Sequence, residues 1–311
     1  MGKLLRFLDN NVLKIGISFL LVFIALYPKF PSVHIVRTWV YIRLEDFFIG
    51  AVILIWLIQL IRRKVSVPWK IAIPFGLYWF FGLLSLVFSL IFIAPTLVNF
   101  FPHLAFLSYL RRIEYMILFF VAFSSVRSKR DIRDYFIILS ITLAGAVLYG
   151  LGQRFYLNIW NIFPGFFEKF PFCFPSVQTG NEEFAKGTPF CLPENARITS
   201  TFAGHYDLGA YLVFVIPIFI AAALLVRKYT WKILISLLSL SSIILLILTA
   251  SRISFVAYLL AVSSTLIFIK KKKFIIPVII LSFLLLIIFS GSTARRFLQT
   301  LRLTSLVTNS Q

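Results

Sequence analysis

Long apolar runs, separated by short charged segments, dominate the chain. A helix that crosses about 30 Å of hydrocarbon needs roughly 20 apolar residues. The first such run is long for a cleavable signal peptide and has further runs behind it, so we interpret it as a retained span. The pattern predicts an all-α, polytopic transmembrane bundle in a single domain, 1–311. Its nine predicted spans cover residues 11–28, 47–61, 71–94, 105–126, 134–154, 207–226, 233–250, 253–269 and 274–290.

The composition excludes other classes of protein. Sixty per cent of the residues are hydrophobic and only 14% are charged, whereas a soluble domain holds about a quarter charged residues. Intrinsic disorder is excluded because it requires low hydrophobicity. The net charge of +20 would suggest nucleic acid in a soluble protein, but in a membrane protein it reflects basic loops and anionic head groups. We therefore predict membrane lipids, and no nucleic acid, as partners.

The basic residues predict the orientation. They recur in every second loop, and the positive-inside rule places such loops in the cytoplasm. Most of the acidic residues fall in the other loops or at their edges. The N-terminus is therefore expected to be cytoplasmic. The basic segments are 3–14, 62–70, 127–133, 227–232 and 270–273.

The longest polar stretch, about 156–206, is predicted to be an outer loop between the fifth and sixth spans. Loops of this length are usually functional. It contains the two cysteines of the chain, Cys173 and Cys191. A disulfide that restrains the loop by about 3 kcal/mol and a pair of buried free thiols are both open at this stage.

Charged residues cluster where this loop enters the sixth span: Arg197, His205 and Asp207. Arg197 could bind phosphate as a bidentate fork or contact lipid head groups. His205 is either a helix cap, an interfacial residue or a catalytic group. Asp207 is placed to stabilise the start of a helix through the helix dipole.

A single arginine, Arg252, interrupts an apolar stretch that is too long for one span. It predicts a tight outer hairpin, with Thr249, Ser251 and Ser254 as neighbouring hydroxyl groups. Arg252 either grips a lipid-linked diphosphate or only marks the turn. We favour the ligand, because turns usually need Gly, Asn or Pro.

Two further charged groups lie near the predicted outer ends of spans two and four. Arg43 lies with Glu45 and Asp46, and Arg111 and Arg112 lie with Glu114. Mixed signs favour structural ion pairing inside the bundle, and binding of an anionic lipid head group is the alternative. There is no Walker loop, HExxH or GxSxG motif. The three histidines lie in different outer segments, so we predict no metal and no cofactor.

The C-terminal segment is amphipathic, and it begins with Arg295 and Arg296 in a predicted outer position. We expect the chain to be the N-terminal part of a longer protein, with an outer loop truncated after Gln311. A short natural tail is the alternative.

Two motifs resemble the O-antigen ligase and polymerase family. One is the segment with Arg197, Thr199, Thr201 and Phe202, and the other is the hairpin with Thr249, Ser251 and Arg252. The segments Tyr27 to Pro31 and Ile42 to Asp46 look like bacterial members as well. The resemblance covers most of the chain.

The resemblance implies a GT-C-like membrane glycosyltransferase at the outer face of a bacterial inner membrane. Such an enzyme moves a glycan from undecaprenyl diphosphate to a glycan, lipid or protein acceptor, without metal or nucleotide sugar. Arg197 and Arg252 match the arginines that hold the donor diphosphate. The family's acceptor-activating histidine would lie beyond Gln311. Supporting roles are open for His205, Asp207, Ser251, Arg43, Arg111 and Arg112.

Two other classes of protein remain open. A multi-pass transporter or flippase of lipid-linked glycans would also use outer arginines, although the sequence shows no clear repeat. A noncatalytic protein of cell-envelope assembly would need no arginine pocket.

Overall fold

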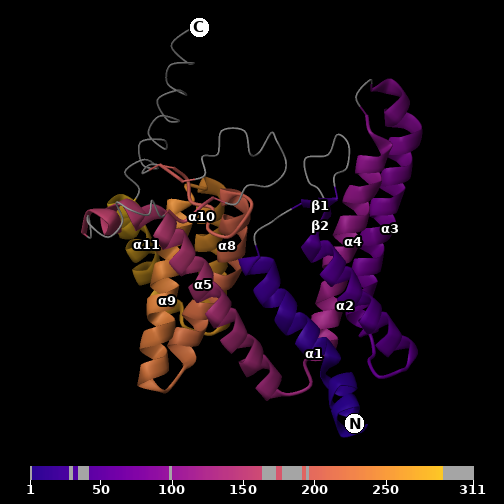
Figure 1. The fold of residues 1–311 in the computed structure, drawn as a ribbon, viewed down its shortest axis with the longest axis horizontal. Helices are drawn as coiled ribbons and strands as arrows, with labels where there is room; N and C mark the ends of the chain where they lie inside the picture. The colour runs from indigo at the N-terminus through magenta and orange to yellow at the C-terminus, as the bar shows by residue number, and fades with distance from the viewer. Residues whose placement is uncertain are drawn as a thin grey trace. The chain divides into compact units, whose positions relative to one another are not determined.

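The computed structural model describes residues 2–27, 31–33, 42–97, 100–162, 173–176, 191–193 and 196–289. Contacts divide the chain into two compact units. Unit 1 comprises residues 1–24 and 31–140, and unit 2 comprises residues 25–30 and 141–311. Figure 1 colours the helices of unit 1 mostly indigo to magenta and those of unit 2 mostly magenta to yellow. The single domain over 1–311 stays a prediction.

Unit 1 is built from helices and one small hairpin. The hairpin pairs β1 (Pro31–Val33) with β2 (Ile42–Arg43) in antiparallel register. A π-helix, Ser89–Ile93, and a 3-10 turn, Ala94–Thr96, extend α3 without a break. The helices of the unit are α1 (Gly2–Leu26), α2 (Leu44–Ile61), α3 (Trp69–Phe88), α4 (Pro102–Ser125) and the beginning of α5 (Lys129–Ile162).

The core of unit 1 lies where α1, α2 and α4 pack together. Gly16 allows the close approach of α1 to α2, since a Cβ there would lie 3.0 Å from a methyl group of Val52. Trp56 Nε1 donates a hydrogen bond of 3.0 Å to Ser124 Oγ. An indole in an apolar core needs such a partner for its N–H group. The buried core residues are Leu13, Ile17, Leu20, Ile49, Val52, Trp56, Phe120 and Val121.

Unit 2 packs its helices around α8. The residues of α8 are fully buried on one side, as at Leu208, Leu212 and Ile216. Near its start α8 meets α10 so closely that a Cβ on Gly209 would lie 2.6 Å from Ser254 Oγ. The helices are the rest of α5, α8 (His205–Leu225), α9 (Tyr229–Leu248), α10 (Arg252–Phe268) and α11 (Ile275–Phe289), with a 3-10 turn at Lys272–Phe274.

The helices bear out a multi-pass membrane protein. In the described part of the chain, six helices are long and apolar enough to cross a membrane, and two shorter helical stretches, Asn11–Leu26 and Arg252–Phe268, are apolar too. Every predicted apolar run falls within a helix, give or take a residue or two at its ends. The all-α class is therefore confirmed, whereas nine crossings and a GT-C arrangement stay predictions.

Helices extend into both ends of the predicted loop. Helix α5 runs to Ile162, and α8 begins at His205, whereas the loop was predicted over 156–206. Residues 155–162 are mostly aromatic, apolar or amide residues that a helix tolerates. Pro164 is the first residue that cannot continue a helix, because it lacks an N–H group and restricts the residue before it.

Candidate functional site

The two motifs that carry the family resemblance meet in unit 2. We call residues 196–204 the motif segment and residues 249–252 the Ser-Arg hairpin. The backbone N–H of Ile198 donates a hydrogen bond of 3.3 Å to the carbonyl oxygen of Leu248, the last residue of α9. Ile198 is 1% exposed, so this contact is shielded from water. Arg197 therefore directly precedes a residue that is hydrogen-bonded to the end of α9, where the Ser-Arg hairpin begins.

Helix α5 holds the motif segment through Ser200. Its backbone N–H donates to Gln153 Oε1 at 2.8 Å, and its carbonyl oxygen accepts from Gln153 Nε2 at 3.3 Å. Its hydroxyl donates to the carbonyl oxygen of Ala146 at 2.6 Å. Ser200 adopts the left-handed conformation, with φ 51°, which is costly for a residue with a Cβ. The three hydrogen bonds offset the cost of this conformation. Strained backbone conformations of this kind are concentrated at functional sites.

The same face of α5 also anchors the described parts of the outer loop. Tyr149 Oη donates to the carbonyl oxygen of Pro175 at 2.8 Å, and Gln153 Nε2 donates to that oxygen at 3.1 Å. Cys173 and Cys191 form a disulfide, with their Cα atoms 5.8 Å apart. Of the two alternatives that the sequence left open, the structure therefore contains the disulfide. The disulfide joins the described segments 173–176 and 191–193, and the hydrogen bonds of Pro175 attach the first of them to α5.

The Ser-Arg hairpin is the tight turn that the sequence predicts. Helix α9 ends at Leu248, and Arg252 is the first residue of α10. Ala250 lies in the left-handed region, with φ 54°. Ser251 caps α10, because its Oγ accepts from the backbone N–H of Ser254 at 3.3 Å. The turn is thus made by residues 249–251, and Arg252 is not needed to form it.

The interior of the hairpin is too small for a diphosphate. Ser251, Arg252 and Phe255 line a cavity of about 10 Å³, which is the size of a single water molecule. The side chain of Arg252 is half-buried. Any anion that contacts Arg252 must therefore bind on the solvent side of the hairpin.

Arg197 and His205 contact each other at the start of α8. Their Nη1 and Nε2 atoms lie 2.9 Å apart. A guanidinium group can only donate hydrogen bonds, so His205 accepts through Nε2 and carries its proton on Nδ1. Gly204 is the N-cap of α8, and Asp207 lies exposed in its first turn. This confirms that the sequence from Gly204 to Asp207 begins a helix.

Three buried donors close to these contacts have no partner within the described chain. They are Nη1 of Arg154, Oγ1 of Thr199 and Oη of Tyr211. Arg154 and Thr199 are the sequence neighbours of Gln153 and Ser200. The hydrogen bonds between Gln153 and Ser200 therefore hold these two stretches of chain against each other. Buried donors are almost always paired.

The other candidate arginines belong to unit 1, where Arg43 and Arg111 form ion pairs. Asp46 Oδ2 accepts from Arg111 Nη2 at 3.0 Å and from the backbone N–H of Arg43 at 2.9 Å. Arg43 Nη1 lies 3.3 Å from Oε1 of Glu45, which is 4% exposed. Arg112 is exposed. These contacts show structural ion pairing between the charged group around Arg43 and the group around Arg111. This is the interpretation that the mixed signs in the sequence favoured.

Sequence reasoning missed the role of α5. Gln153 contacts both the motif segment and the loop, and Arg154 and Tyr149 lie on the same stretch of helix. A usable signal was present, because polar residues at the end of an apolar run usually face a partner or a cavity. Among the described residues, no group of three or more His, Cys, Asp and Glu side chains is arranged to hold a metal ion.

Comparison with known protein families, curated proteins and solved structures gave no match to this chain. The resemblance to the O-antigen ligase and polymerase family therefore stays a prediction from the residues of the two motifs.

Proposed function

We propose that the motif segment and the Ser-Arg hairpin bind the diphosphate of an undecaprenyl-linked glycan. The protein is, in this proposal, a glycosyltransferase of the O-antigen ligase or polymerase type. The observation that carries the proposal is the hydrogen bond between Ile198 and Leu248, 3.3 Å long. It joins the segment of Arg197 to the hairpin of Arg252. Two arginines far apart in the sequence are thereby attached to one backbone junction.

The chemistry of transfer suits such a site. The acceptor hydroxyl oxygen attacks the anomeric carbon, the bond from that carbon to the diphosphate oxygen breaks, and its electron pair stays on the diphosphate. Preorganised guanidinium groups stabilise this charge as it develops. The hydroxyl proton goes to a general base. His205 is not our candidate, because its Nε2 already accepts from Arg197.

The buried donors support an oxygen-rich ligand. Thr199 is 8% exposed and its hydroxyl makes no hydrogen bond within the described residues. Leaving such a group unpaired costs about 1–3 kcal/mol. A diphosphate offers several acceptor oxygens, and Thr199 is two residues from Arg197 in the motif segment.

The proposal includes a location. It places the protein in a bacterial inner membrane, with the N-terminus in the cytoplasm and the two motifs at the outer face. The basic loops support this orientation through the positive-inside rule.

Binding of undecaprenyl diphosphate tests the donor site directly. The protein is reconstituted in nanodiscs, and the dissociation constant is measured for wild type, Arg252→Ala and the control Arg227→Ala. Arg227 is exposed between α8 and α9. Loss of one charge-assisted contact is expected to weaken binding about tenfold or more. Equal affinities of the Arg252 and Arg227 variants would refute the donor site.

A second assay separates the enzyme from a flippase. The protein as its gene encodes it is supplied with a labelled lipid-linked glycan and an acceptor. A new glycosidic bond, abolished by Arg252→Ala, supports transfer. Movement of the glycan lipid across the bilayer without a new bond would favour the transporter instead.

A further inference from the structure

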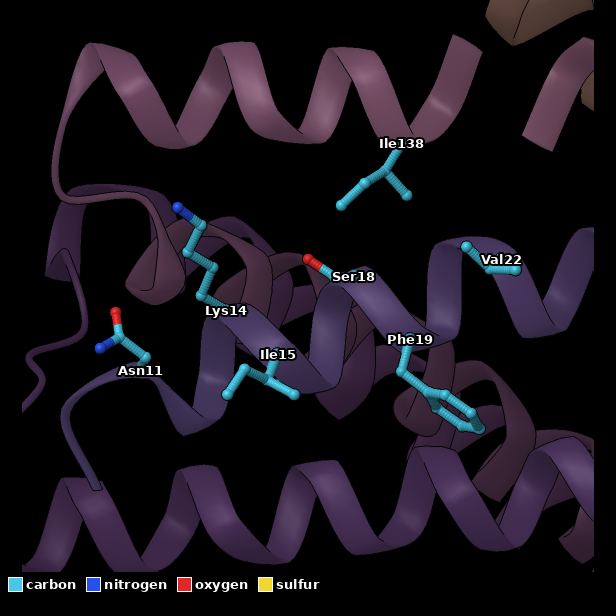
Figure 2. Close-up of a pocket in the computed structure, with 7 residues that line it drawn as sticks. All are labelled: Asn11, Lys14, Ile15, Ser18, Phe19, Val22 and Ile138. Atoms are coloured by element: carbon cyan, nitrogen blue, oxygen red, sulfur yellow. The ribbon is translucent and has the colours of Figure 1, made fainter. Parts of the chain in front are cut away.

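Unit 1 contains a groove that no part of the proposed transfer reaction uses. It has a volume of about 490 Å³ and is open along one side of α1. Figure 2 shows Ile138 of α5 pointing towards α1 across the groove. The lining residues are Asn11, Lys14, Ile15, Ser18, Phe19, Val22 and Ile138.

The groove is polar at one end and apolar at the other. Asn11 and Lys14 lie at the start of the stretch of α1 that lines it, and Phe19 and Val22 lie two turns further on. Phe19 and Val22 are 42% and 39% exposed. Because α1 carries an apolar stretch over Asn11–Leu26, this part of the groove faces hydrocarbon rather than water.

A second cavity continues from the polar end. It measures about 220 Å³ and shares Asn11 and Lys14 with the groove. Its further lining comes from the end of α4 and the turn into α5, at Ser125, Arg127 and Asp131. We call it the polar compartment. Together the two cavities offer a polar chamber that opens into an apolar channel.

The charged residues of the polar compartment and its adjoining segment have a positive balance, because two carboxylates stand against five basic residues: Lys14, Arg127, Lys129, Arg130 and Arg133. Lys14 Nζ lies 2.6 Å from Asp131 Oδ1 and 2.7 Å from Asp134 Oδ2. One ammonium group therefore contacts both carboxylates, and Arg133 Nη2 lies 3.7 Å from Asp134 Oδ1. Arg127 is exposed, and its guanidinium forms no ion pair within the residues that the structure describes. The compartment is thus suited to an anion.

We propose that the groove and the polar compartment together bind one anionic glycerophospholipid of the surrounding membrane. Arg127 contacts the phosphate, and one acyl chain lies along Ile15, Phe19 and Val22 against Ile138. The basic segment 127–133 adds attraction for the anionic surface of the bilayer. Basic pockets between transmembrane helices are known sites for anionic lipid head groups.

The geometry favours a lipid over a soluble anion. A free phosphate would use the compartment but leave the apolar groove unfilled. An amphiphile fills both cavities, and the membrane supplies it at high concentration. The order of the lining, polar and then apolar along one helix, is the order of head group and chain in a lipid.

Native mass spectrometry of the purified full chain in a nonionic detergent tests the proposal. Phosphatidylglycerol and phosphatidylcholine with identical acyl chains are added separately. One phosphatidylglycerol per chain is expected to bind at least about tenfold more tightly than phosphatidylcholine, the difference that one charge-assisted contact provides. Equal binding of the two lipids, or no bound lipid at all, would overturn the proposal.

Two matched pairs of variants locate the lipid. Arg127→Gln is expected to weaken phosphatidylglycerol binding about tenfold, whereas Arg227→Gln, at an exposed arginine of unit 2 that lines neither cavity, leaves it unchanged. Ile138→Trp fills the groove and is expected to reduce binding, whereas Ile137→Trp, next to it but outside the lining, does not. Each pair decides independently, so one variant that fails to fold does not remove the test. No difference within a folded pair contradicts the proposal.

A soluble headgroup compound distinguishes a site for a phospholipid from a site for a free phosphate. Glycerol 1-phosphate lacks acyl chains, so it is not expected to displace bound phosphatidylglycerol at equal concentration. Displacement at equal concentration would show an anion site without a lipid groove, and the proposal would be wrong.

Discussion

Nη1 of Arg197 lies 2.9 Å from Nε2 of His205. Because arginine only donates hydrogen bonds, the histidine fixes the direction of the guanidinium at the start of α8. The sequence singled out both residues but gave them separate roles. In the structure His205 is a positioning residue for Arg197, on which the proposed donor site depends.

Removing His205 should therefore act through Arg197. We expect His205→Ala to weaken binding of undecaprenyl diphosphate about two- to fivefold, and Arg197→Ala to weaken it further, since one hydrogen bond and one charged contact differ in strength. The double variant should bind like Arg197→Ala alone, which is the signature of coupled residues. Additive losses in the double-mutant cycle would show that the two side chains act independently.

Gln153 should be essential for the stability of unit 2. Gln153→Leu keeps the size of the side chain but leaves the buried N–H group of Ser200 without its acceptor at 2.8 Å. The expected loss is about 1–3 kcal/mol in the free energy of unfolding, measured by titration with sodium dodecyl sulfate in mixed micelles. Gln153→Glu keeps that acceptor but replaces the donor to the carbonyl oxygens of Ser200 and Pro175 with an acceptor, so it should lose stability as well. A fully stable Gln153→Leu would contradict the anchoring role.

Gly209 should tolerate no larger residue. A Cβ there would lie 2.6 Å from Ser254 Oγ and 3.0 Å from Ser254 Cβ, so Gly209→Ala must separate α8 from α10. Overpacking of this kind costs about 1–3 kcal/mol. The matched control is Gly50→Ala in α2, where a Cβ meets nothing within 4 Å. That variant should be neutral or stabilising, and equal effects of the two would be inconsistent with the packing described.

The ion pair between Arg111 and Asp46 should stabilise unit 1. Arg111→Met removes the partner of Asp46 at 3.0 Å and leaves its carboxylate largely buried. We expect the free energy of unfolding to fall by about 2–4 kcal/mol. This loss is smaller than for a fully buried pair, because the Arg111 side chain is 28% exposed. Arg112→Met, at the exposed neighbour, should change little. Adding Asp46→Leu to Arg111→Met should restore part of the stability.

The disulfide should resist alkylation and support the loop. Mass spectrometry without reductant is expected to find no alkylated cysteine, and two after reduction. Reduction should lower the stability of unit 2 by about 3 kcal/mol in the loop-entropy model. Cys173→Ser with Cys191→Ser should reproduce the effect of reduction. Two alkylated thiols in the untreated protein would exclude the bond.

The helices in the described part of the chain were predictable because a hydrophobic run consists of consecutive residues and can be recognised without knowledge of tertiary contacts. The start of α8 after its N-cap Gly204 and the position of the hairpin before Arg252 were predicted from the local sequence. The end of α5 was predicted eight residues early, since polar residues near Gln153 resemble the start of a loop. Only packing shows that they face the motif segment.

The candidate site divides in the same way. Composition and the spacing of apolar runs establish a multi-pass helical membrane protein with basic loops, and residue type and position single out Arg197, Arg252 and the cysteines. The tertiary structure alone decided that Ile198 meets Leu248, and that Gln153 binds Ser200. These contacts join residues that are far apart in the chain, and nothing in the local pattern specifies which helix faces will pack together. Backbone geometry also belongs to this second group, because Ser200 and Ala250 adopt left-handed conformations that only the surrounding contacts maintain.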